Sequence, residues 1–148
     1  MNKVSIVIGS ESDRTLAEEA VSLLNEFGVT SELKVLSAHR NPEQLAEYVK
    51  STDAQVFIAV AGLSAALPGA IAARTLKPVI GVPRAVKLEG LDSLLSIAQM
   101  PSGVPVACVG IDNVKNASLL AVEILAEKDE KLVEKLAKYR ERWEQVAD

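Results

Sequence analysis

The chain has 148 residues, a length typical of one domain; 49% of them are hydrophobic, but only 3% are aromatic. Its formal net charge of −4 gives no reason to expect nucleic acid or an anionic membrane as a partner. A single cysteine, Cys108, excludes an intramolecular disulfide and a zinc site of clustered cysteines. No apolar run is long enough to span a bilayer, and no signal peptide precedes the first expected strand, so we expect a cytoplasmic protein.

Strands and helices are expected to alternate along residues 1–126, which we interpret as one domain. Short runs rich in β-branched residues predict strands, and apolar residues three and four apart predict helices. The expected strands cover residues 4–8, 31–36, 56–60 and 78–81, with a fifth within 104–110. The expected helices cover residues 13–27, 42–51, 65–74, 90–99 and 113–126. Because the strands lack alternation and helices separate them, the sequence predicts an α/β fold: a doubly wound parallel sheet in a flavodoxin-like three-layer sandwich.

Residues 127–148 form a second predicted unit, a charged C-terminal helical arm. Its apolar positions follow a spacing of four, three, four and three: Leu132, Leu136, Tyr139, Trp143 and Val146. That spacing gives a narrow seam of the coiled-coil type. The seam could pack on its own domain or on a neighbouring subunit, and we favour the neighbour because the only tryptophan lies far along the helix.

The first loop at the carboxyl edge of the predicted sheet is Gly9-Ser10-Glu11-Ser12-Asp13. A glycine and serines at a helix start offer hydroxyls, free N–H groups and a favourable dipole to a phosphate. Ser12 or Asp13 could equally cap the helix, and capping is compatible with ligand binding. The loop matches neither the dinucleotide-binding GxGxxG pattern nor a nucleoside triphosphate-binding Walker A loop.

The central loop, Ser37-Ala38-His39-Arg40-Asn41-Pro42, holds the only histidine in the chain. It follows an expected strand, and Pro42 suits the first turn of a helix. Ligands of open parallel sheets bind at this edge. The loop offers a hydroxyl, a proton carrier that titrates near neutral pH and a permanently charged anion clamp. A lone histidine can also be a plain surface or core residue, but the neighbouring loops favour a site.

The third loop begins Ala61-Gly62-Leu63-Ser64 and continues to Leu67. Its small residues allow close backbone approach to a ligand, and helix N–H groups could hold a carboxylate. Tight packing of a helix on the sheet is the alternative. A receiver domain of a signalling system would need an aspartate at the end of this strand, and none is present.

Five ordered motifs carry a resemblance to a known family: 9–13, 37–40, 67–69, 78–83 and 92–101. Together they resemble the catalytic subunit of phosphoribosylaminoimidazole carboxylase, also called N5-carboxyaminoimidazole ribonucleotide mutase. The resemblance covers about residues 4–126. It implies a step of de novo purine synthesis, in which a carboxylate moves from the exocyclic nitrogen of an aminoimidazole ribonucleotide to ring carbon C4. It implies no metal and no cofactor, and a homo-oligomer, expected to be an octamer with sites between subunits.

The same resemblance implies roles for individual residues. His39 is the expected catalytic proton shuttle, and Arg40 the expected phosphate contact. The other expected substrate-binding residues are Ser10, Ser12, Asp13, Ser37, Ala61, Gly62, Leu63, Ser64 and Leu67. The first three would hold phosphate and ribose, Ser37 would line the same pocket, and the loop from Gly62 would surround the carboxylate or carbon dioxide.

One position departs from the family pattern. Bacterial mutases usually have a histidine where this chain has Ala66. This leaves open direct carboxylation of aminoimidazole ribonucleotide by free carbon dioxide, or a non-catalytic nucleotide-binding homologue. A related carboxylase acting on a pyridinium dinucleotide is a further alternative. Retention of His39 and Arg40 together argues against the non-catalytic homologue.

Overall fold

Five parallel strands form the centre of the structure, a computed structural model that describes residues 1–144. The strands are β1 (Lys3–Ile8), β2 (Thr30–Val35), β3 (Val56–Gly62), β4 (Val79–Arg84) and β5 (Ala107–Cys108). The helices are α1 (Arg14–Glu26), α2 (Pro42–Ser51), α3 (Leu67–Ala72), α4 (Leu91–Ala98), α5 (Val114–Ala126) and α6 (Glu130–Glu144). Two short 3₁₀ turns, Glu11–Asp13 and Leu88–Gly90, precede α1 and α4. The strand order β2-β1-β3-β4-β5 is the flavodoxin-like one, so the predicted fold class is confirmed.

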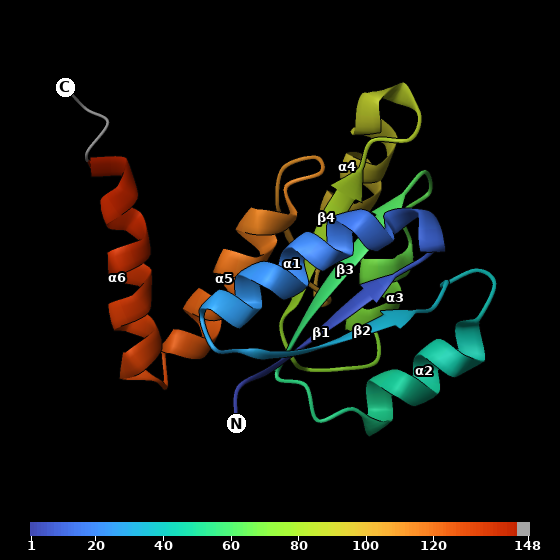
Figure 1. Ribbon diagram of the computed structural model, residues 1–148. Coiled ribbons are helices and arrows are strands. Elements are labelled where there is room, and N and C mark those ends of the chain that lie inside the picture. Colours follow the sequence, from blue (N-terminus) through green and yellow to red (C-terminus); the bar gives the residue numbers. More distant parts are fainter. Residues whose placement is uncertain (145–148) are drawn as a thin grey trace.

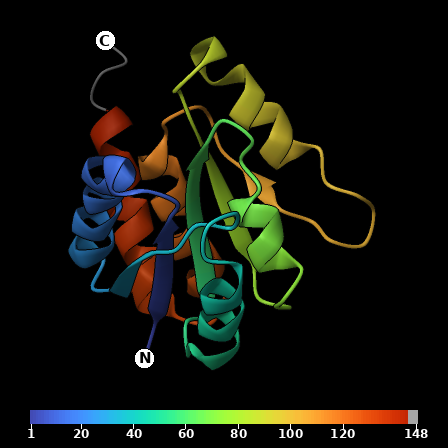
Figure 2. The same cartoon turned by 90° about the vertical axis from the view of Figure 1, so that its right-hand side faces the viewer.

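Helices cover both faces of the sheet, as the near-continuous burial of β1, β3 and β4 requires. One core cluster packs α1 and α5 on the sheet through residues such as Leu24, Ile58 and Val122. The other packs α2, α3 and α4 through Leu45, Ile71 and Ile97. In Figures 1 and 2, α1 and α5 lie on the opposite side of the sheet from α3 and α4. The core is aliphatic, as the low aromatic content leads one to expect; Phe57 is its largest fully buried side chain.

Two elements are shorter than the sequence suggested. β5 contains only Ala107 and Cys108, which pair with Ile80 and Gly81 of β4, respectively. Pro101 and Pro105 have no N–H to donate to a sheet, and the chain around them forms a loop. α3 begins at Leu67 rather than at 65, with Pro68 in its first turn.

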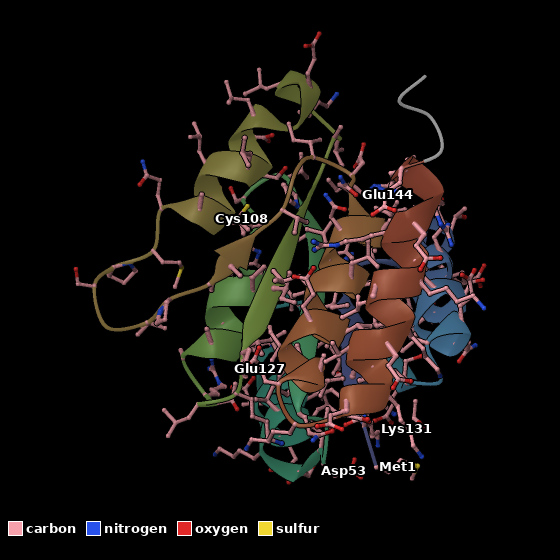
Figure 3. The ribbon with its side chains drawn as sticks, turned by 90° about the vertical axis from the view of Figure 1, so that its left-hand side faces the viewer. Met1, Asp53, Cys108, Glu127, Lys131 and Glu144 are labelled. Atoms are coloured by element: carbon pink, nitrogen blue, oxygen red, sulfur yellow. The ribbon has the colours of Figure 1, made fainter. Side chains whose placement is uncertain are left out.

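The C-terminal helix α6 folds back on its own chain. Leu132 is 3% exposed in the first core cluster, and the Tyr139 ring lies 5.6 Å from the Phe27 ring, centroid to centroid. Lys135 Nζ donates to the Phe27 carbonyl at 2.7 Å. Figure 3 shows α5 and α6 side by side between the turn at Glu127 and the helix end at Glu144. The own-domain packing that the sequence left open is therefore present up to Tyr139, although the neighbouring subunit was favoured.

Beyond Tyr139 the seam is less covered. Trp143 is 65% exposed, and Val146, the last residue of the predicted seam, lies outside the described residues. None of the helices formed by residues 1–144 is long and apolar enough to cross a bilayer.

Candidate active site

Three loops at the carboxyl ends of β1, β2 and β3 line one cleft of about 690 Å³. All the residues that the sequence nominated line it: Ser10, Ser12, Asp13, Ser37, His39, Arg40, Ala61, Gly62, Leu63, Ser64 and Leu67. The parallel register explains this convergence, because Ile8, Val35 and Val60 are aligned across neighbouring strands. The chain therefore leaves all three strands at the same edge.

The β1 loop is folded by its own hydroxyls. Ser10 caps the first 3₁₀ turn, where its Oγ accepts from the Ser12 backbone N–H at 3.3 Å and from the Ser12 hydroxyl at 3.1 Å. The Asp13 N–H donates to the Ser10 carbonyl at 3.0 Å. Asp13 also serves as the N-cap position of α1 but makes no side-chain capping hydrogen bond there. Its carboxylate is therefore available for another partner.

The central loop is held as a compact turn before α2. Ser37 Oγ accepts from the Arg40 N–H at 3.1 Å, and Asn41 Oδ1 accepts from the Ser37 N–H at 3.1 Å. The Arg40 guanidinium donates to the Gly9 carbonyl at 2.8 Å, which joins the central loop to the β1 loop. His39, between these anchored residues, is exposed in the cleft wall. The arrangement places a proton carrier beside an anion-binding group.

The β3 loop supplies a backbone surface with few side-chain polar groups. Leu63 has a φ of 56°, a left-handed conformation that is uncommon for a leucine, and its side chain is 48% exposed. Ala66 is exposed in the cleft, at the N-cap position of α3. The site thus contains His39 but no imidazole at the Ala66 position.

The sequence missed residues contributed by the end of β4 and by the segment that follows it. Val86 lines the cleft and lies so close to Gly62 that a Cβ there would be 2.7 Å from its Cγ2 atom. Arg84 Nε lies 3.1 Å from Asp13 Oδ1. The register pairs Gly62 with Arg84. In the sequence, the only signal for a contribution from this region was a cation shortly after the predicted strand.

Asp13 is the only cleft residue whose pKa departs clearly from its ordinary value. Burial raises the pKa of its carboxyl, and Asp112 adds to that increase, while Arg84 and a hydrogen bond from the Ser10 backbone oppose it. Within residues 1–144, no group of three or more histidine, cysteine or acidic side chains is placed to hold a metal ion. The side chains that line the cleft can bind an anion and transfer a proton.

Comparison with known proteins gives a consistent result. The family model described as AIR carboxylase matches residues 3–146. A protein of Methanocaldococcus jannaschii named N5-carboxyaminoimidazole ribonucleotide mutase is 58% identical over 94% of this chain and 88% of its own length. The Thermotoga maritima protein of the same name is 47% identical over 96% of this chain and 85% of its own length.

Structure comparison agrees with the sequence comparison. The crystal structure of Treponema denticola PurE superposes with a TM-score of 0.89 and is 31% identical, covering 98% of this chain and 93% of that one. The family that the sequence motifs resembled is therefore confirmed: this chain belongs to the AIR carboxylase family.

Proposed function

We propose that this protein converts N5-carboxyaminoimidazole ribonucleotide to 4-carboxy-5-aminoimidazole ribonucleotide in purine biosynthesis. The observation that carries the proposal is the convergence of the phosphate-type loop, His39 and the β3 loop on one cleft. Relatives that share about half of their residues with this chain bear the name of that mutase.

The substrate is oriented by its phosphate and ribose. Ser10, Ser12 and Arg40 supply hydroxyls and a guanidinium for the phosphate, and Asp13 supplies a carboxylate that accepts from ribose hydroxyls. Ser37 lines the same pocket and anchors the Arg40 backbone at 3.1 Å. This placement directs the imidazole ring toward His39 and the β3 loop.

The reaction needs one group that both gives and takes a proton, and His39 is the only imidazole in the chain. The bond between the exocyclic nitrogen and the carboxylate carbon breaks, and that nitrogen takes a proton from the His39 imidazolium. The carbon dioxide released stays against the backbone of Ala61–Leu67 until C4 of the ring attacks its carbon. The neutral His39 then removes the proton from C4, which restores the carboxylated aromatic ring and the imidazolium.

A second candidate is direct carboxylation of aminoimidazole ribonucleotide by free carbon dioxide. The observation that favours it is Ala66, an exposed methyl group in the cleft where bacterial mutases usually have a histidine. In that reaction the same loop receives carbon dioxide from solution, and His39 only removes the C4 proton.

One assay separates these candidates and the non-catalytic alternative. The purified protein is given N5-carboxyaminoimidazole ribonucleotide, or aminoimidazole ribonucleotide with and without bicarbonate, and the carboxylated imidazole is followed by its absorbance. The proposed mutase uses the first substrate without added bicarbonate. Turnover only of the second substrate with bicarbonate would establish the carboxylase instead, and no turnover of either would leave the non-catalytic homologue.

We also propose that the protein is a cytoplasmic homo-oligomer, with an octamer as the expected size. An open groove of about 660 Å³ between α5 and α6, lined by Leu119, Leu120, Tyr139 and Trp143 among others, offers apolar surface to a second copy. The exposed leucines 88, 91 and 95 at and before α4 offer another such surface. Light scattering that shows a stable monomer at micromolar concentration would contradict the proposal.

A further inference from the structure

The contact between Arg84 and Asp13 joins the ends of two strands that are not neighbours in the sheet. Arg84 is the last residue of β4, and Asp13 ends the loop that follows β1, with β3 lying between these strands. The Arg84 Nε atom is 3.1 Å from Asp13 Oδ1. The side chain of Asp13 is 8% exposed and that of Arg84 is 28% exposed, so the pair is mostly shielded from water.

Shielding makes this pair different from the other ion pairs near the site. Glu11 and Arg14 pair at 2.6 Å on the outside of the β1 loop, with side chains 67% and 43% exposed. Exposed pairs contribute little, whereas loss of one partner from a shielded pair leaves an uncompensated charge. The position of Asp13 at the cleft therefore depends on the cation behind it.

Charged groups from several elements face Asp13. The Asp112 carboxylate, in the turn before α5, opposes its ionisation, while the Ser10 backbone and Arg84 favour it. His39 and Arg40 face the same cleft from the central loop. Asp112 also accepts from the Ala85 N–H at 3.0 Å, which holds the segment after β4 beside the β1 loop. The backbone is thus held at Ala85, directly after Arg84, and Arg84 itself is held at its guanidinium.

We infer that Arg84 is a positioning residue: through its ion pair it holds the Asp13 carboxylate in place and oriented toward the ribose of the bound nucleotide. Arg84 is absent from the cleft lining, so it acts through Asp13 and not by touching the substrate. Without it, burial and Asp112 would act on Asp13 unopposed by a side-chain cation, and the pKa of the carboxyl would rise further. The inference rests on the proposed function for the identity of the ligand.

The test compares Arg84→Met and Arg84→Lys with the wild type. Arg140→Met is the matched control, because it removes an ion pair of 2.7 Å between α6 and Glu123 of α5, away from the cleft. Affinity for 4-carboxy-5-aminoimidazole ribonucleotide is measured by calorimetry at one pH for all variants, because loss of a charge-assisted contact has a measurable cost. The Asp13 carboxyl is titrated by carbon NMR in the absence of nucleotide.

We expect Arg84→Met to raise the pKa of Asp13 and to raise Kd by about tenfold or more, because the carboxylate loses the cation that holds it in place. Arg84→Lys restores the charge and most of the affinity, and Arg140→Met leaves both measurements unchanged. An unchanged Asp13 pKa in Arg84→Met, or an unchanged Kd, would overturn the inference and leave Arg84 a structural residue.

Binding and turnover by the wild-type protein test the proposed function separately from the role of Arg84. A wild-type protein that binds the nucleotide without turnover refutes the proposed reaction, while the affinity and NMR data still decide the role of Arg84. A wild-type protein that binds no nucleotide refutes both.

Discussion

The contacts around two glycines on adjacent strands predict that the same added methyl group changes stability by different amounts. Gly81 of β4 and Gly62 at the end of β3 both have ordinary negative or extended backbone angles, so alanine strains neither backbone. At Gly81 a Cβ would collide with Ile97 Cγ2 and lie 3.2 Å from Pro68 Cγ. Ile97 is 1% exposed and Pro68 is also buried, so neither has space to move. At Gly62 the only close atom is Val86 Cγ2, and Val86 is 50% exposed.

These contacts determine how far each substitution changes the free energy of unfolding. Overpacking a tight core costs about 1–3 kcal/mol, and Gly→Ala at a compatible site recovers about 0.4–1 kcal/mol through the unfolded chain. We therefore expect Gly81→Ala to lower the free energy of unfolding by about 1–2 kcal/mol. At Gly62 a displaced Val86 rotamer costs about 0.5–1.5 kcal/mol, which the same entropic gain nearly offsets. Gly62→Ala should leave stability within about 1 kcal/mol of wild type.

Urea unfolding followed by far-ultraviolet circular dichroism measures both variants, at one protein concentration because assembly shifts apparent stability. Fluorescence is a poor probe here, since the only tryptophan, Trp143, is already 65% exposed. Gly62→Ala should also weaken nucleotide binding, because it displaces a residue that lines the cleft, whereas Gly81→Ala should not. Equal loss of stability in the two variants would refute the packing argument.

Three further predictions concern catalysis and assembly. His39→Asn should lower turnover by about 100-fold or more while nucleotide affinity, which we propose rests on Ser10, Asp13 and Arg40, changes little. Steady-state kinetics measures the turnover and calorimetry the affinity, and normal turnover would end the proposal. Ala66→His should change turnover less than His39→Ala does in the same assay, and an increase by orders of magnitude would mean that the chain has lost a catalytic group. Truncation after Glu127 should lower the melting temperature, because Leu132 and Tyr139 cover the core beside Phe27. An unchanged melting temperature would contradict the packing seen for α6. Light scattering of the same variant tests whether α6 also supports assembly.

The sequence by itself determined the fold class and the composition of the candidate site. Uninterrupted apolar strands separated by helical periodicity leave few ways to bury both faces of a sheet, so a doubly wound parallel sheet could be expected from the alternation alone. The parallel register then brings the loops after β1, β2 and β3 to one edge, which is why residues chosen one loop at a time share a cleft. The fold prediction depended on local periodicity and on the direction of strands, and both are encoded over short stretches of chain. The roles of individual site residues came from the resemblance to a known family.

Only the tertiary structure decided which side chains oppose one another across distant segments. Arg84 and Asp13 are 71 positions apart, and the distance between them follows from the sheet order and from the loop conformation, neither of which leaves a pattern in the sequence. The same holds for Val86 against Gly62 and for the Tyr139 ring near Phe27. The heptad-like spacing of α6 specified an apolar seam but not its partner, because an apolar surface packs on any complementary surface. Helix α5 of the same chain supplied such a surface.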